Sequence, residues 1–232
     1  MFPRPALARI LLAALPLVLA GTACSSGTKT DPAAALAAAR RTLDAAPTLH
    51  LSLTSPDFTV SGVRVAGLDG SLARPDRFGG TLQILLAGSP ISVPIVAAGG
   101  TTYARLPLTT SFTKVDPATY GIGDPAGLLN PDTGLSSLLT AAKNPTVKTR
   151  DRINGEVVDE ISAALPGSAL TRILPGRTTT ADVPATLAVT TSSHQLRRVV
   201  LTGALAGSAT STVTIVLDRF GEPVTIAAPP TP

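Results

Sequence analysis

The chain has 232 residues, a formal net charge of +4, a charged fraction of 15% and an aromatic fraction of 3%. This length fills one domain well, and a second domain is not required. The basic residues form isolated pairs, and there is little aromatic surface on which bases stack, which excludes nucleic-acid binding. Hydrophobic residues make up 44% of the chain and are mainly aliphatic. Such a composition suits either a filled core or a cavity for alkyl chains.

Residues 1–23 have the pattern of a lipoprotein signal peptide. Two arginines precede the apolar run Ile10–Ala20, which is too short to span a bilayer stably. The small residues of 21–23 then lead to Cys24, the only cysteine of the chain. In a bacterial lipoprotein this thiol takes a diacylglyceryl group and cleavage makes the cysteine the first residue. Gly21 stands where the usual lipobox has leucine. We therefore expect Cys24 to be lipidated and to anchor the protein at the outer (periplasmic) face of the cell membrane.

The mature chain is predicted to begin with a flexible tether at 24–30, followed by one domain at 31–228 and a disordered tail at 229–232. Asp31 and Pro32 are typical of a helix N-terminus, and Pro47 ends the predicted helix. From about Leu49 the apolar period changes to two, which predicts antiparallel strands through about residue 106. Pro94 has no N–H, so its strand is expected at an edge or with a bulge.

The middle of the chain is predicted to be helical. The turn at 130–134 caps a helix whose apolar stripe is Leu135, Leu138, Leu139 and Ala142, and Pro145 closes it. Asn154-Gly155 predicts a hairpin over about 146–162. A short helix at about 168–173 and four strands at about 184–191, 196–205, 210–218 and 223–227 follow. The predicted fold class is α+β, a broad antiparallel sheet with helices gathered on one face.

Catalytic signals are poor. His50 and His194 are isolated in sequence, and no neighbouring carboxylate or cysteine completes a site around either. The acidic residues of the predicted hairpin (Asp151, Glu156, Asp159 and Glu160) are interpreted as a solvated face. Nucleophile-elbow, zinc-protease and Walker motifs are absent from the sequence. We therefore predict no enzyme activity, no cofactor and no metal site.

Several segments together resemble a known family. They are Asp124-Pro125, the run 129–135 (Leu-Asn-Pro-Asp-Thr-Gly-Leu), Arg150-Asp151 with 153–155, 183–186, 194–196, and Gly221-Glu222 with Val224. In this order they resemble the mycobacterial LppX/LprA/LprF/LprG lipoproteins, most of all LprG, over essentially the whole chain. One departure is Phe112, where LprG has tryptophan.

The resemblance implies an antiparallel half-barrel similar to the LolA/LolB carriers, with helices on its concave face and an apolar cavity for acyl chains between them. It implies a carrier that moves acylated lipids or glycolipids across the periplasm toward the outer envelope, with a major-facilitator exporter as partner. The expected cavity residues are Leu82, Ile84, Leu86, Ile91, Val93, Leu128, Leu135, Leu138 and Leu139.

Two alternatives differ from the carrier. A structural or transporter-accessory lipoprotein would have a filled core in place of the cavity. A lipid hydrolase would need a nucleophile and a base, and the sequence shows no such pair.

Overall fold

The computed structural model describes residues 30–60, 62–120, 123–173, 181–205 and 210–231. Cys24 and the predicted signal peptide lie outside these ranges. Eleven strands form one antiparallel sheet in the order β6-β5-β4-β3-β2-β1-β11-β10-β9-β8-β7. The strands are β1 (Thr48–Val60), β2 (Val63–Ala73), β3 (Arg77–Leu86), β4 (Ser89–Ala98), β5 (Thr101–Ala104), β6 (Thr113–Val115), β7 (Lys143–Ile153), β8 (Glu156–Leu165), β9 (Val183–Thr190), β10 (Leu196–Gly203) and β11 (Ser211–Asp218).

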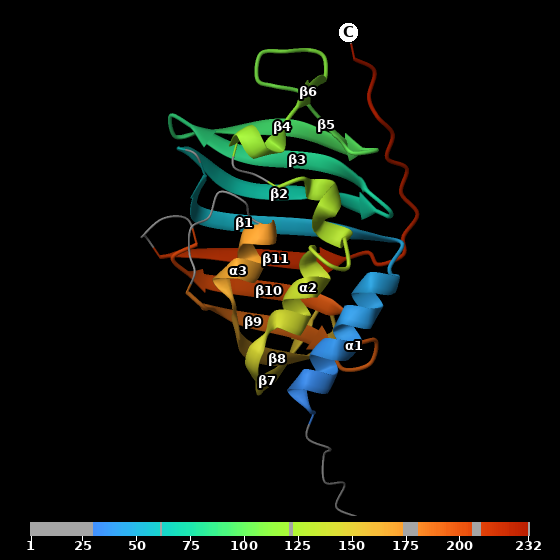
Figure 1. The fold of residues 1–232 in the computed structure, drawn as a ribbon, viewed down its shortest axis with the longest axis vertical. Coiled ribbons are helices and arrows are strands. Elements are labelled where there is room, and N and C mark those ends of the chain that lie inside the picture. Colours follow the sequence, from blue (N-terminus) through green and yellow to red (C-terminus); the bar gives the residue numbers. More distant parts are fainter. Residues whose placement is uncertain (1–29, 61, 121–122, 174–180, 206–209, 232) are drawn as a thin grey trace, which may run out of the picture.

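The helices lie together on one face of this open sheet (Figure 1). They are α1 (Pro32–Ala45), α2 (Leu135–Ala141), α3 (Gly167–Ile173) and the short 3-10 turns η1 (Pro117–Tyr120) and η2 (Pro125–Leu129). The predicted α+β class is confirmed. The sheet has an inner face toward the helices and an outer face toward solvent.

Helix α1 forms where its N-terminal signals predicted it. The Asp31 carboxylate accepts hydrogen bonds from the backbone N–H groups of Ala33 (2.9 Å) and Ala34 (3.4 Å), and Pro32 occupies the first helical position. These bonds satisfy donors that have no partner within the helix. Leu36 and Leu43 are buried against the sheet.

The register gives each strand one inner face. Leu51 of β1 pairs with Leu217 of β11 and with Gly70 of β2, and Leu82 of β3 pairs with Leu68 of β2 and Val93 of β4. Because successive side chains alternate between faces, these pairs bring aliphatic side chains from five strands to one surface. The hydrophobic core lies between that surface and the helices.

Two sequence predictions need correction. Pro94 lies on an internal strand without a bulge. The β4–β5 ladder ends at the pair Ile95 and Ala104, and beyond it only the Arg105 N–H bonds to the Pro94 carbonyl (3.0 Å). The N–H that proline lacks would therefore point past the end of this ladder, where β5 needs no donor.

The predicted strand at 223–227 is wrong, because this segment crosses the outer face of β3. The Arg77 guanidinium donates to the Ile226 carbonyl (2.5 Å), and the Ile226 side chain lies over Gly79. Ile226 is therefore buried by packing on the sheet, whereas Val224 is exposed, and the segment pairs with no described strand.

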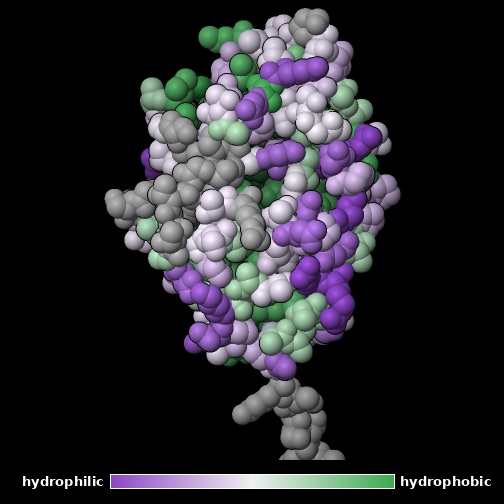
Figure 2. All heavy atoms as spheres, in the orientation of Figure 1, coloured by the Kyte–Doolittle hydropathy of each residue, from purple (hydrophilic) through white to green (hydrophobic). Residues whose placement is uncertain are grey.

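Hydrophilic side chains run along the right side of Figure 2, whereas apolar ones stand out at its upper left, with hydrophilic ones beside them. The upper end of the molecule carries the β3–β4 hairpin and the loop between β5 and β6 (Figure 1). Thr30, which leads into α1, lies at the opposite end. In the described part of the chain, we find no helix with the length and apolarity needed to cross a membrane.

Candidate lipid-binding site

Two adjoining cavities lie between the inner face of the sheet and the helices. The central cavity has a volume of about 80 Å³ and lies under α2, α3 and η2. The distal cavity has a volume of about 250 Å³ and lies toward β5, β6 and η1. Val65, Leu68, Leu82 and Pro125 border both cavities. The two spaces therefore share one wall of side chains.

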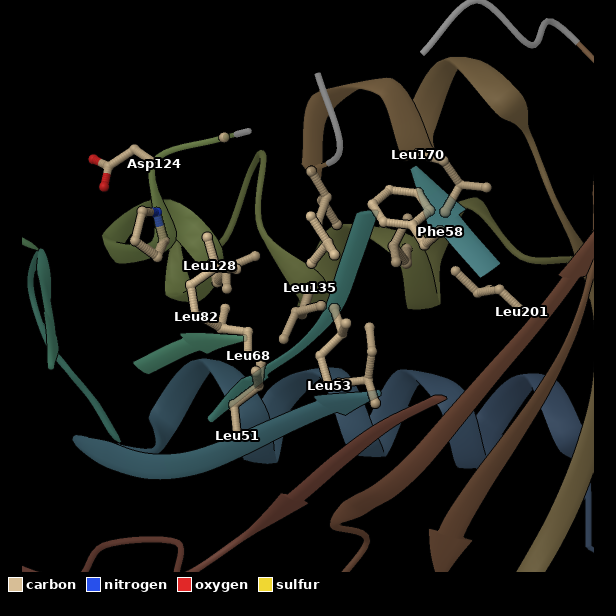
Figure 3. Close-up of a pocket in the computed structure, with 16 residues that line it drawn as sticks. Leu51, Leu53, Phe58, Leu68, Leu82, Asp124, Leu128, Leu135, Leu170 and Leu201 are labelled. Carbon is tan, nitrogen blue, oxygen red and sulfur yellow. The ribbon is translucent and has the colours of Figure 1, made fainter. Parts of the chain in front are cut away.

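The walls of the central cavity are almost wholly aliphatic (Figure 3). Leu51 and Leu53 of β1 point into it from the sheet, and Leu135 of α2 points into it from the helices. Among the described residues, the one charged residue at its border is Asp124, and its carboxylate turns away from the leucines. That carboxylate accepts the Ala126 N–H (3.0 Å) as the N-cap of η2. It is thus committed to holding η2 in place.

The turn before α2 positions the helical side of the site. The Asn130 side-chain carbonyl accepts from the backbone N–H groups of Asp132 (2.9 Å) and Thr133 (3.2 Å). Gly134 packs so closely that an added Cβ would lie 2.4 Å from the Leu128 carbonyl oxygen. Only glycine fits at this position, and the close approach sets Leu128 of η2 and Leu135 of α2 on the same cavity.

The distal cavity reaches the surface. Its border includes Ile84 and Val93 on the sheet, and Leu106, Pro107 and Tyr120 in the segments that follow β5 and β6. Tyr120 is 46% exposed and Pro107 is also exposed. These two exposed residues bring part of the cavity border to the surface, at the end of the molecule that carries β5 and β6, and we call this part of the border the distal mouth.

Six of the nine residues expected from the sequence border these cavities. They are Leu82, Ile84, Val93, Leu128, Leu135 and Leu138.

Leu139, Leu86 and Ile91 border neither cavity. Leu139 is buried in the core. It follows Leu138 by one residue on α2, so its side chain points in a different direction from the side chain that borders the cavity. Leu86 and Ile91 share the inner face but lie near the β3–β4 turn, beyond the side chains that cover the cavity, and Leu86 is 56% exposed.

The sequence analysis missed other residues of the border. Leu51 and Leu53 were visible in the period-two run of β1, but nothing local placed that strand beside the cavity. Phe58 follows a register shift in the β1–β2 ladder, which breaks the alternation. Leu170 and Leu201 meet the others through long-range packing alone.

Two acidic residues of the β7–β8 hairpin are buried, contrary to the solvated face expected. Asp159 is 3% exposed and accepts hydrogen bonds from the Arg150 guanidinium (2.8 Å) and the Thr30 hydroxyl (2.7 Å). Burial raises the pKa of Asp159, but the bonds from Arg150 and Thr30 outweigh it, so the pKa lies below its ordinary value. Glu160 pairs with Arg198 (2.6 Å) on the outer face. The bonds that Asp159 accepts from Thr30 and Arg150 thus join the start of the domain to the β7–β8 hairpin.

His50 also has carboxylate partners that the sequence did not reveal. Its Nδ1 lies 2.9 Å from Asp218 and its Nε2 lies 3.4 Å from Asp69, on the outer face of the sheet. Both ring nitrogens are engaged by carboxylates, so neither is placed to take a proton from a nucleophile. Among the described residues no cluster of three or more metal-binding side chains occurs.

The model of the LppX_LprAFG lipoprotein family matches residues 31–226. The chain belongs to this family. The lipoarabinomannan carrier protein LprG of Mycobacterium tuberculosis is 33% identical over 92% of this chain and 90% of its own length. LprG of Mycolicibacterium smegmatis is 30% identical over 94% and 93%. The family resemblance predicted from the sequence is confirmed.

Two solved structures share the fold. LprF from Mycobacterium bovis has a TM-score of 0.71 at 21% identity and covers 87% of this chain and 99% of its own. LppX from M. tuberculosis has a TM-score of 0.63 at 17% identity, over 85% and 100%. The half-barrel fold is thus the family's fold, and the family is one of carrier lipoproteins rather than enzymes.

Proposed function

We propose that this protein binds acylated lipids or glycolipids in the two cavities and carries them across the periplasm toward the outer envelope. The observation that carries the proposal is the aliphatic double cavity between sheet and helices, whose distal part is bordered by the exposed residues Pro107 and Tyr120. Relatives whose name is lipoarabinomannan carrier protein support the class of cargo.

The physical basis is transfer of alkyl chains out of water. Each CH₂ group moved into an apolar site contributes about 0.8 kcal/mol, so a few carbons supply substantial affinity without polar contacts. A cavity of about 150 Å³ already admits benzene, and the distal cavity is larger, at about 250 Å³. We expect chains to enter from the distal mouth and to reach the central cavity by displacing the shared wall at Leu68 and Leu82. The polar head group would stay at the mouth.

We propose further that Cys24 carries the lipid anchor at the outer face of the cell membrane. Thr30 lies six residues after Cys24, and six residues reach at most about 20 Å. Because Thr30 is bonded to Asp159, the anchor would hold the β7–β8 end near the membrane and the distal mouth away from it. That orientation suits transfer to an acceptor beyond the anchoring membrane. The major-facilitator exporter implied by the resemblance remains a prediction, which in-cell crosslinking tests.

Native mass spectrometry tests the cargo. The protein is purified from its own host, and the lipid that travels with it is released and identified. A carrier gives a defined adduct of acylated lipid that disappears on delipidation and returns when the extracted lipid is added back. A single lipid-free mass that takes up no extracted lipid would instead establish the filled-core alternative.

A further inference from the structure

The tip of the β5–β6 loop combines two features that each disfavour leucine. Leu106 to Thr109 form a turn in which the Thr109 N–H bonds to the Leu106 carbonyl (3.1 Å), with Pro107 at its second position. The third position, Leu108, has a φ of 66°, where such turns select glycine or asparagine. The Leu108 side chain is also fully exposed, at 107%.

The strained backbone of Leu108 points to a role other than folding, because its exposed side chain makes no packing contact that would stabilise the fold. A glycine at position 108 would relieve the backbone and remove an apolar group from water, yet the chain has leucine there. Sparsely populated backbone conformations persist where the surrounding structure holds them, and they cluster at functional sites. The Thr109 hydroxyl adds a second bond to the Leu106 carbonyl (2.7 Å), which keeps the turn formed and the leucine presented.

Leu108, Leu86 and Tyr120 are large exposed apolar residues of the segments that form or adjoin the border of the distal cavity. Leu86 is 56% exposed and follows the cavity residue Ile84 by two positions on the same face. Tyr120 is 46% exposed and itself borders the cavity. We call Leu86, Leu108 and Tyr120 the distal rim. Figure 2 shows apolar side chains at the upper left of the molecule, with hydrophilic ones beside them.

The segment that carries the distal rim has few charges, mostly positive, and Arg64 of the neighbouring strand β2 pairs with Leu85, next to Leu86. From residue 86 to residue 120 the charged side chains are Arg105, Lys114 and Asp116. Arg105 lies over the Phe112 ring, 5.8 Å from its centroid, and Lys114 is exposed. Exposed apolar residues beside cations are typical of proteins that enter the interface of an anionic bilayer. Insertion at this end would desolvate few charges.

We propose that the distal rim docks on an anionic lipid surface, with Leu108 inserted among the acyl chains. This inference rests on the proposed carrier function and adds the surface at which cargo is exchanged. The rim is continuous with the distal cavity through Leu106 and Pro107, which immediately precede Leu108 and border that cavity. An acyl chain leaving the bilayer at the rim would thus stay on apolar side chains until it reached the cavity.

A tryptophan reporter tests the docking. The chain has no tryptophan, so Leu108→Trp gives a single emitter at the rim. Val224→Trp is the matched control, because Val224 is exposed at 36% and lies two residues before Ile226, which packs on the outer face of β3 and not on the inner face that carries the cavity. The full chain of each variant is mixed with vesicles of phosphatidylcholine and phosphatidylglycerol whose acyl chains carry bromine. We expect blue-shifted and quenched emission from Leu108→Trp and neither change from Val224→Trp. Unquenched Leu108→Trp, or equal quenching of both, overturns the proposal.

A second variant separates docking from cargo binding. Leu108→Asn suits the backbone of the turn and removes the apolar side chain, so vesicle affinity should fall about tenfold. At equilibrium its delipidated form should bind as much added lipid as the delipidated wild type, because Leu108 does not border either cavity, and its melting temperature should stay equal or rise. Unchanged vesicle affinity in this variant would refute the docking role. A wild-type protein that holds no lipid would refute the carrier function, whatever the vesicle result.

Discussion

Leu82→Trp distinguishes an open cavity from a filled core, because Leu82 borders both cavities. Its position is set by pairing with Leu68 on one side and Val93 on the other, which places the side chain on the inner face. An indole at this position would extend into the spaces of about 80 and 250 Å³. Added volume in a packed core costs about 1–3 kcal/mol, whereas an open space accepts it for less than about 1 kcal/mol.

The expected effect on cargo is larger than the effect on folding. If the indole excludes even three CH₂ groups, binding weakens by about 2.4 kcal/mol, or roughly fiftyfold. A change of 1 kcal/mol in folding shifts the melting temperature by about 2–4 °C in a domain of this size. We therefore expect lost lipid together with a melting temperature within about 4 °C of the lipid-free wild type.

Leu187→Trp is the matched control for this experiment. Leu187 lies on β9 with no exposed surface, and it borders neither cavity. The same chemical change there should lower the melting temperature markedly. Bound lipid is measured by native mass spectrometry and stability by calorimetry on delipidated protein. Equal destabilisation by Leu82→Trp and Leu187→Trp, in a chain that never holds lipid, would refute the cavity and favour the filled core.

Three further predictions follow from the ends of the domain. Cys24→Ala should remove the anchor, so that the protein leaves the detergent phase or accumulates as precursor; wild-type partitioning would contradict lipidation. Asp31→Ala should cost about 1 kcal/mol of folding free energy, because two N–H groups of α1 lose their acceptor, and urea titration measures it. The lowered pKa of Asp159 means that its contribution to stability is present above its unfolded pKa, about 3.9, and is lost as pH falls through the folded value. Asp159→Asn should therefore destabilise the protein at neutral pH and flatten its acid unfolding curve, and an unchanged curve would contradict the pairing with Arg150.

Local signals in the sequence determined much of the secondary structure. Asp31 and Pro32 start α1, and Asn154-Gly155 turns the β7–β8 hairpin with both residues at positive φ. These features depend on backbone preferences within a few residues, so the sequence alone reveals them. The segment at 223–227 shows the limit, because its alternation is the same whether it pairs in a sheet or lies across one.

The cavity was only partly determined by the sequence. Alternation placed Leu82, Ile84 and Val93 on one face correctly, because every second residue of a strand points to the same side of the sheet. It placed Leu86 and Ile91 on that face as well, but how far the helical segments cover the face depends on tertiary packing. The buried Asp159 required Arg150 and Thr30 from other segments to satisfy it.

The sequence by itself determined the family, the alternation of the strands and the ends of the helices, because these follow from neighbouring residues. Only the tertiary structure decided that the aliphatic faces leave space between them. Leu51 meets Leu217 from the far end of the chain, and Leu135 and Leu170 meet Leu201 across the same gap. Whether such side chains close on one another or line a cavity depends on the curvature of the sheet and the reach of the helices. No local pattern encodes either quantity.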